Sequence, residues 1–411
     1  MAADRPTILQ IIPQLDTGGA ELSAIEIVGA LASAGARALV ATEGGRMADA
    51  LEAAGGEIIA LPLATKNPIQ IYANAARLAR LIEAEGVDLV HARSRAPAWS
   101  ALWAARRTKR PFVTTYHGAY SETGPMKRAY NQVMAKGDVV IANSAYTAGL
   151  IRSRYGTPES RVRIIHRGVD EVAFNPATLS GDRIATVRAA WGVAADTPVI
   201  LQAARLTRWK GQTVLIDALA RLAVEQPDLP WVAILAGDDQ GRTAYRDELK
   251  SKAEALGLGD RVRLVGHVGD MPAAFATAAV TVIASIEPEA FGRTAVEAQR
   301  MGSPVIATRI GAPPETVLAT PEVADEARTG WLVPPGDASA LVMALTDALT
   351  LTATQRSSLA QRATSHAAAR FTLDAMRRAT LSVYDGLLGT TLAGRFDAAH
   401  SDARFVDPQP K

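Results

Sequence analysis

Short runs of consecutive apolar residues recur along the chain, and alanine-rich stretches of helical character separate them. Such runs are typical of parallel strands that are covered on both faces of a sheet. The runs form two series: Thr7–Ile12, Ala38–Ala41, Leu89–His91, Phe112–Tyr116 and Val139–Ala142, then Val199–Ala203, Val232–Ala236, Val262–Val265, Val280–Ala284 and Val305–Ala307. The two series predict an α/β protein made of two Rossmann-like domains with parallel sheets.

The gap between the series lies near Asn175–Asp196, where Asn-Pro and Ser-Gly-Asp combinations indicate turns. A helical stretch from about residue 340 to 388 closes the fold, and the polar tail after it is expected to be disordered. We therefore predict, in chain order, an amino-terminal domain at 1–178, a second domain at 179–375, a closing helix at 376–392 that packs back on the first domain, and a disordered tail at 393–411.

The composition is that of an ordinary globular protein, with 48% hydrophobic and 21% charged residues in 411. The chain has no cysteine, which excludes disulfides, thiolate metal sites and a cysteine nucleophile. No apolar run approaches the ~20 residues that span a bilayer, and the first residues lack the layout of a signal peptide. We therefore expect a cytoplasmic protein.

The net charge is only +2, but residues 1–170 hold 20 lysines and arginines against 15 acids. The excess is concentrated between Arg93 and Lys136, where Glu122 is the one acid. Such a cluster suits an anionic membrane surface or an anionic acceptor, and a solvated helix face is the alternative. Nucleic acid is disfavoured because no aromatics punctuate the basic positions. The cations of this segment are Arg93, Arg95, Arg106, Arg107, Lys109, Arg110, Lys127, Arg128 and Lys136.

Ligands of open α/β sheets bind beyond the carboxyl ends of the strands, and the chemically distinctive residues of this chain fall there repeatedly. A cleft between the two domains would collect them. The glycine pair would let the backbone approach a ligand closely, although an ordinary tight turn explains it equally well. The residues that follow predicted strands or open the next helix are Gly18, Gly19, His117, Arg205, Lys210, Gly237 and Glu289.

Two carboxylates, Glu289 and Glu297, stand eight positions apart around the start of a predicted helix. The first would lie on the loop before the helix and the second about two turns into it. Free backbone N–H groups at a helix start attract anions such as a diphosphate. The carboxylates would then hold hydroxyls on either side of that diphosphate, which is the layout of a nucleotide sugar. An acidic helix start with a solvated second glutamate is the alternative.

Arg205 and Lys210 place two cations at a strand end and a helix start, where they oppose the helix dipole. A bound diphosphate would account for them, and two surface cations are the alternative. His117 is either a binding residue or a structural histidine. His91 has a similar strand-end position with weaker support, and we leave it out of the predicted site. No two aspartates are separated by one residue, so we expect neither a metal site nor another cofactor.

In this combination the chain resembles the family 4 glycosyltransferases, which have the GT-B fold of two Rossmann-like domains facing across a cleft. The resemblance extends from Ile8 to about Leu388. It implies retention of anomeric configuration without a metal, with the acceptor on the first domain and the nucleotide sugar on the second. The motifs that carry it are Gly18–Glu21, Thr115–Gly118, Ala142–Ser144, Arg167–Asp170, Ala204–Gly211, Glu289–Glu297 and Thr329–Asp337.

Carried over to this chain, the resemblance implies that Arg205 and Lys210 bind the diphosphate. Glu289 would bind hydroxyls of the donor sugar, and Glu297 those of the ribose. The backbone of Phe291, Gly292 and Arg293 would cap the diphosphate.

Two further roles follow from the same resemblance: Gly19 would approach the phosphate, and His117 would lie by the anomeric carbon. We also place Gly18 and Gly237 in the predicted donor site, because each follows a predicted strand.

The chain departs from the family at Arg293, which stands where an aliphatic residue is frequent, and at His166-Arg167, which replaces a frequent Pro-Asn. The segment from His91 to Arg107 resembles transferases that build the core of bacterial lipopolysaccharide, some of which use GDP-mannose. We therefore expect transfer of a hexose, with GDP-mannose as the favoured donor, to a glycolipid at the cytoplasmic face of the inner membrane. A UDP-sugar-dependent transferase that acts on a different or soluble acceptor is the alternative, and a silent nucleotide-sugar-binding protein is a remote one.

Overall fold

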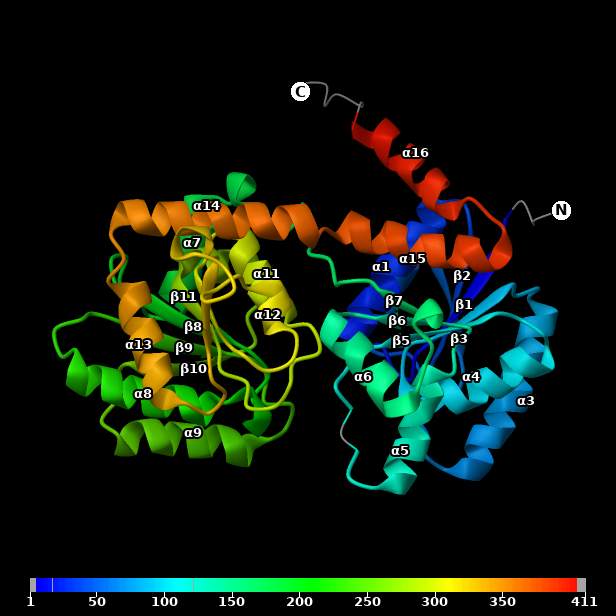
Figure 1. Ribbon diagram of the computed structural model, residues 1–411, viewed down its shortest axis with the longest axis horizontal. Coiled ribbons are helices and arrows are strands. Elements are labelled where there is room, and N and C mark those ends of the chain that lie inside the picture. The colour runs from blue at the N-terminus through cyan, green and yellow to red at the C-terminus, as the bar shows by residue number, and fades with distance from the viewer. Residues whose placement is uncertain (1–4, 17, 121, 405–411) are drawn as a thin grey trace. The chain divides into compact units, whose positions relative to one another are not determined.

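The computed structural model describes residues 5–16, 18–120 and 122–404, with the backbone alone described at 402–404. The chain divides into two compact units. The first comprises Met1–Gly168 and Leu373–Lys411, and the second comprises Val169–Thr372. Each unit holds one sheet in which all paired strands are parallel, so the predicted α/β architecture of two Rossmann-like domains is confirmed (Figure 1).

The sheet of the first unit has the strand order β3-β2-β1-β4-β5-β6-β7. Its strands are β1 (Thr7–Ile11), β2 (Arg37–Thr42), β3 (Gly56–Ala60), β4 (Leu89–Ala92), β5 (Phe112–Tyr116), β6 (Val139–Ala142) and β7 (Val162–Ile164). Its helices are α1 (Gly19–Ser33), α2 (Ala48–Ala53), α3 (Pro68–Ala84), α4 (Arg95–Arg107), α5 (Pro125–Asn131), η1 (Gln132–Ala135), α6 (Ala145–Tyr155), η2 (Glu159–Arg161), α15 (Leu373–Leu388) and α16 (Leu392–Arg404).

Helices cover both faces of this sheet. On one face α3, α4 and α6 pack on alternate strand residues, and on the other α1, α2, α15 and α16 do so. The strands are therefore buried on both sides, which is why they read as continuous apolar runs.

The sheet of the second unit has the strand order β10-β9-β8-β11-β12-β13. Its strands are β8 (Val199–Ala203), β9 (Val232–Ala236), β10 (Val262–Gly266), β11 (Ala278–Ile283), β12 (Val305–Thr308) and β13 (Gly330–Val333). Its helices are η3 (Pro176–Thr178), α7 (Gly181–Ala190), η4 (Arg208–Lys210), α8 (Gln212–Glu225), α9 (Thr243–Ala255), α10 (Met271–Thr277), α11 (Arg293–Arg300), α12 (Pro313–Thr316), η5 (Asp325–Ala327), α13 (Ala338–Leu349) and α14 (Ala353–Arg370).

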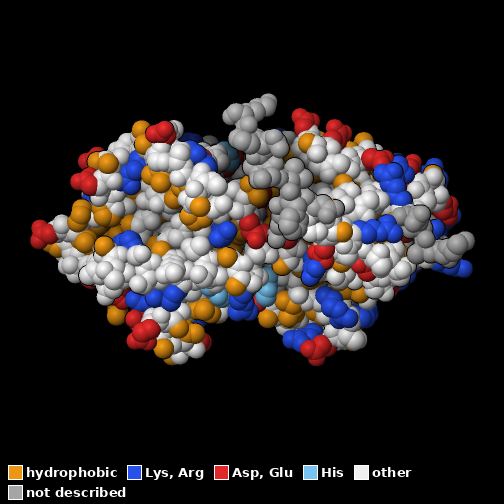
Figure 2. Space-filling model, turned by 90° about the horizontal axis from the view of Figure 1, so that it is seen from above, with side chains coloured by type: hydrophobic (Ala, Val, Ile, Leu, Met, Phe, Trp, Pro, Cys, Tyr) orange, Lys and Arg blue, Asp and Glu red, His pale blue; other side chains and the backbone are white. Residues whose placement is uncertain are grey.

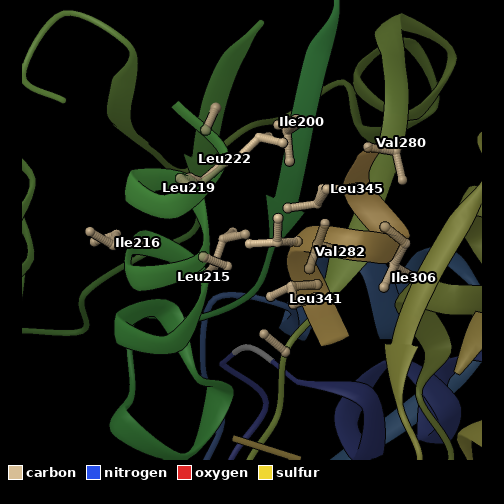
Figure 3. Close-up of a cluster of buried hydrophobic side chains, with 14 of the residues drawn as sticks. Ile200, Leu215, Ile216, Leu219, Leu222, Val280, Val282, Ile306, Leu341 and Leu345 are labelled. Atoms are coloured by element: carbon tan, nitrogen blue, oxygen red, sulfur yellow. The ribbon is translucent and has the colours of Figure 1, made fainter. Parts of the chain in front are cut away.

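Two apolar layers enclose this second sheet as well. Leucines of α8 and α13 lie against Ile200 of β8 and Val282 of β11 on one face (Figure 3). On the other face α7, α10 and α11 pack against the same strands. The strand order places the carboxyl ends of β8 and β11 side by side, which positions the loops that carry the candidate site.

The unit boundaries differ from the predicted ones at 178/179 and 375/376. Val169 donates its amide to the Phe371 carbonyl at 2.8 Å and forms a bridge with Thr372, so the two segments on which the chain crosses between units are paired. Phe174 also packs on Phe275 in the core of the second unit. The turn at Asn175-Pro176, which suggested the boundary, therefore lies inside the second unit.

Three strands, β3, β7 and β13, were not predicted from the sequence. All three lie at sheet edges, and two of them carry charged residues, Glu57 in β3 and Arg163 in β7. β3 and β7 are partly solvated and do not need an uninterrupted apolar run, so the pattern used for the central strands missed them. β13 is apolar and largely buried, and it was missed although it fits that pattern.

The carboxyl-terminal stretch also differs from expectation. The helical run predicted at 340–388 is three helices, and α15 packs its Leu373, Met376 and Leu381 into the core of the first unit. The tail was expected to be disordered from residue 393, but residues 392–404 form α16, while 405–411 lie outside the described residues. Leu392 and Phe396 are fully buried, and these two apolar positions anchor the otherwise polar helix.

Candidate functional site

The centre of the candidate site in the second unit is an ion pair between Lys210 and Glu289. Lys210, at the end of the β8–α8 loop, places Nζ 2.5 Å from Oε1 of Glu289, in the loop after β11. The Ser285 hydroxyl donates to the same carboxylate oxygen at 2.6 Å. The side chains of Lys210 and Glu289 are 18% and 9% exposed, so the pair is largely shielded from water. The structure thus brings together two residues that the sequence analysis predicted for one site.

Two buried glutamines hold the loop that carries the cations, and the sequence analysis missed both. Gln202 in β8 donates its amide to the Lys210 carbonyl at 2.8 Å, and Gln212 at the start of α8 donates to the Arg205 carbonyl at 3.0 Å. The Trp209 ring lies 4.2 Å from Lys210 Nζ. The glutamine inside the apolar run of β8 could have indicated this role, because a buried polar side chain needs a hydrogen-bond partner.

The loop that carries Glu289 is fixed by close backbone packing. Ala312 donates its amide to the Glu289 carbonyl at 2.9 Å, and Glu289 pairs with Gly311 as an isolated bridge. Gly311 has φ of 85°, and a Cβ there would lie 2.2 Å from the Glu289 carbonyl oxygen. A glycine is therefore required at this position, and it holds the carboxylate in place.

Glu297 lies about one turn into α11, not two as predicted, because the helix begins only at Arg293. Gly292 caps this helix in the left-handed conformation, and Phe291 is buried before it. Arg293 Nε lies 2.7 Å from Glu297 Oε1 along the helix. The arginine at the position where the family often has an aliphatic residue therefore engages the carboxylate predicted to bind ribose.

Arg205 and Gly237 lie at the carboxyl ends of β8 and β9. The Arg205 side chain is exposed, and no described residue accepts a hydrogen bond from its guanidinium. Gly237 donates to the Gly266 carbonyl at 2.8 Å, and a Cβ on it would lie 1.9 Å from the Ala204 carbonyl oxygen. The glycine thus has a packing role beside Arg205, whether or not a ligand approaches it.

Gly18, Gly19 and His117 belong to the first unit. Gly18 caps α1 and Gly19 is its first residue, and a Cβ on Gly19 would meet no atom within 4 Å. His117 follows β5, and Arg167 lies in hydrogen-bonding contact with its Nδ1. Burial first, and then the Arg167 charge, hold the pKa of His117 well below its usual range. The imidazole is therefore neutral at physiological pH, and its Nε2 has no hydrogen-bond partner among the described residues.

A buried polar cluster lies at the same end of this sheet. Arg93 is only 2% exposed, contacts Gln10 and donates to the Ser23 hydroxyl at 3.3 Å, and burial lowers its pKa. His91 lies 2.6 Å from the Tyr384 hydroxyl of α15. Arg93 was predicted to belong to a basic segment that suits an anionic membrane surface or an anionic acceptor, and its burial excludes it from a membrane-facing surface.

The burial of His91 predicts a loss of stability at acid pH. His91 is fully buried, and desolvation lowers its pKa well below the value of the unfolded chain. Below about pH 6.5 the unfolded state takes up a proton that the folded state excludes, so unfolding becomes easier by up to ~1.4 kcal/mol per pH unit. Urea unfolding between pH 7.5 and 5 should show this fall, and His91→Gln should make it less steep, while His117, whose pKa burial also lowers, accounts for part of the slope that remains. An equal slope in the variant would contradict the assignment.

Within the described part of the chain, no group of three or more histidine, aspartate or glutamate residues is arranged to hold a metal ion. None of the helices in this described part has the length and apolarity that crossing a membrane requires.

Comparison with known proteins identifies the class to which this fold and site belong. Residues 17–172 match the family described as Glycosyltransferase Family 4, and residues 184–366 match the one described as Glycosyl transferases group 1. The crystal structure of a glycosyltransferase from Rickettsia africae is 32% identical, with a TM-score of 0.84 over 94% of this chain and 100% of that chain. The two parallel-sheet units therefore form a GT-B glycosyltransferase. The chain belongs to glycosyltransferase family 4.

Two further relatives are named by their ligands or activity. The Anabaena protein HepE, crystallised with UDP and glucose, is 26% identical with a TM-score of 0.79 over 93% of this chain and 100% of that chain. The D-inositol 3-phosphate glycosyltransferase of Jonesia denitrificans is 33% identical over 239 residues, 54% of this chain and 56% of that protein. The chain spans about half the length of the curated relatives it matches.

Proposed function

We propose that this chain transfers a hexose, with retention of configuration and without a metal, from a nucleotide sugar to a hydroxyl of an anionic acceptor. The observation that carries the proposal is the Lys210–Glu289 pair beside the amino terminus of α11. Glu289 stands four residues before this helix, so the pair places a cation and a carboxylate near a helix start, and the amino terminus of a helix favours the negative charge of a diphosphate that carries a sugar.

Each charged group has a chemical task in such a transfer. As the bond between sugar and phosphate breaks, negative charge grows on the departing diphosphate, and Lys210 and Arg205 stabilise it. Glu289 holds Lys210 and leaves Oε2, for which no partner is described, to accept a sugar hydroxyl. The acceptor oxygen attacks the anomeric carbon on the face from which the diphosphate departs, and the acceptor proton passes to the departing phosphate. In the first unit, the family resemblance gives His117 a place by the sugar, and its neutral imidazole adds no positive charge.

The first question about specificity is which nucleotide sugar serves as the donor. The sequence favours GDP-mannose, whereas the structural relative HepE was crystallised with UDP and with UDP-glucose. We propose a UDP-hexose as the leading donor and keep GDP-mannose as the second candidate, because the segment from His91 to Arg107 resembles transferases that use it.

The acceptor is proposed to carry a phosphate or another anionic group. Curated relatives are named for inositol 3-phosphate, a phosphorylated polyol, and the sequence predicts a glycolipid of the lipopolysaccharide type at the cytoplasmic membrane face. Both kinds of acceptor carry a negatively charged group. Arg93 and Arg167 place positive charge beside His117 in the first unit, which suits either of them.

Donor binding tests the proposal most directly. We would measure the melting temperature of the full chain with UDP-, GDP- and ADP-sugars, with and without a chelator, and then follow turnover of the stabilising donor. A shift with a UDP-sugar that survives chelation supports the proposal, and a shift with GDP-mannose alone selects the second donor. No shift with any donor, or a shift abolished by the chelator, would overturn the proposed metal-free transfer.

A further inference from the structure

Three helices of the first unit share a one-sided charge. Helices α3, α4 and α5 contain a single acid, Glu83, near the end of α3. Against it stand the cations Arg77, Arg80, Arg95, Arg106, Arg107, Lys127 and Arg128. Arg106 is paired with Asp138 at 2.8 Å, and the excess of positive charge that remains on these helices attracts partners of the opposite sign.

Large apolar side chains project from the same helices. Ile69 and Tyr72 of α3 are 78% and 74% exposed, and Trp103 of α4 is 43% exposed. Ile69 and Tyr72 lie three residues apart and so share one side of α3. The Tyr72 ring lies 6.4 Å from that of Trp103, which in turn lies 5.7 Å from the ring of Trp99. A continuous aromatic row therefore runs across α3 and α4 at the surface.

Cations flank this row and an adjoining hollow. Lys136 places Nζ 5.5 Å from the centre of the Trp99 ring. A surface pocket of about 460 Å³ adjoins Trp103, and its lining includes Arg106, Lys136 and Arg161 but no acid. Positive charge beside exposed tryptophan and tyrosine is the combination found where proteins meet the headgroups of a bilayer.

We propose that this docking surface, made of Ile69, Tyr72, Trp99, Trp103 and Lys136 with the surrounding cations, binds an anionic phospholipid bilayer. The aromatic rings enter the headgroup region, and the arginines and lysines lie near the lipid phosphates. Such binding needs no spanning helix. The inference goes beyond the proposed transfer reaction, because it states where the enzyme works and does not depend on the identity of donor or acceptor.

The surface differs from the basic segment that the sequence indicated between Arg93 and Lys136. Arg93 is buried and contributes nothing to the surface, whereas Ile69 and Tyr72 come from a helix outside that segment. On the face drawn in Figure 2, by contrast, basic and acidic side chains are interspersed. Only the folded chain gathers α3 and α4, which pack against each other, into one aromatic and cationic surface.

Flotation of the full chain with lipid vesicles tests the proposal. Vesicles of phosphatidylcholine with phosphatidylglycerol should capture the protein at low salt, whereas vesicles of phosphatidylcholine alone should capture far less. Tyr72→Ser with Trp103→Ser should weaken capture about tenfold or more, and Arg80→Glu with Arg107→Glu should do so in a salt-dependent way.

The matched control is Val224→Ser with Met343→Ser, two side chains that are 79% and 71% exposed in the second unit. It should bind like the unchanged protein.

Several outcomes would overturn the docking surface. These are no capture by anionic vesicles, capture that both double variants retain, or a concentration-dependent dimer that the Tyr72→Ser with Trp103→Ser variant loses while vesicles capture nothing. The last result would assign the surface to a second copy of the chain. The melting shift produced by the nucleotide sugar is measured on every variant. Its absence throughout, with vesicle capture intact, would overturn the proposed function and leave the docking surface standing.

Discussion

Replacing Lys210 with alanine is expected to lower kcat by about 10²–10³, because the leaving diphosphate then loses a positioned charge. The structure strengthens this expectation, since Lys210 is held by Glu289 at 2.5 Å and its carbonyl by Gln202 at 2.8 Å. A cation in a fixed place need not reorganise as charge develops. Steady-state turnover of the donor found in the melting experiment gives the measurement.

The matched control for this variant is Lys250→Ala, because Lys250 lies on α9 with its side chain 72% exposed. That change should leave kcat unaltered. Removing Lys210 leaves Glu289 without its counter-ion in a shielded place, so stability must be measured alongside activity. The double change Lys210→Met with Glu289→Gln removes both charges and should fold but remain inactive. A Lys210→Ala protein that folds and turns over at the normal rate would refute the diphosphate assignment.

Replacing Gly237 with alanine is expected to lower the free energy of unfolding by about 3 kcal/mol, through overpacking against the backbone. The added Cβ would lie 1.9 Å from the Ala204 carbonyl oxygen and 2.6 Å from the carbonyl carbon. Both are main-chain atoms at the end of β8, so no side-chain rotation relieves the clash. The loop that carries Arg205 must shift, and donor affinity should fall with stability. Urea unfolding and the nucleotide-dependent melting shift measure the two effects.

Gly19→Ala provides the comparison, since a Cβ on Gly19 meets no atom within 4 Å and the residue begins a helix. Its free energy of unfolding should change by no more than about 1 kcal/mol, in the stabilising direction. A loss of turnover in this variant at unchanged stability would support the predicted approach of a phosphate to the backbone there. Equal stability of Gly237→Ala and the unchanged protein would contradict the close packing of β8 and β9.

The sequence by itself determined the central strands and the class of protein. Continuous apolar runs such as Val199–Ala203 and Val232–Ala236 are required wherever a parallel strand is covered on both faces, so the pattern identified them. The edge strands β3 and β7 are partly solvated, do not meet that requirement and were not predicted. The order of motifs along the chain predicted a family 4 glycosyltransferase, which the comparisons confirm.

Tertiary structure alone decided which side chains meet. Lys210 and Glu289 are 79 positions apart, and only the neighbouring positions of β8 and β11 in the sheet bring their loops together. The sequence likewise could not separate the buried Arg93 from the exposed cations after it, nor join Tyr72 to Trp103 across two helices. The local pattern of apolar and polar positions determines the secondary structure of each segment, because intrinsic propensity and this pattern act over a few residues. Charge pairing and surface exposure depend on contacts between distant segments, and these exist only once the chain is packed.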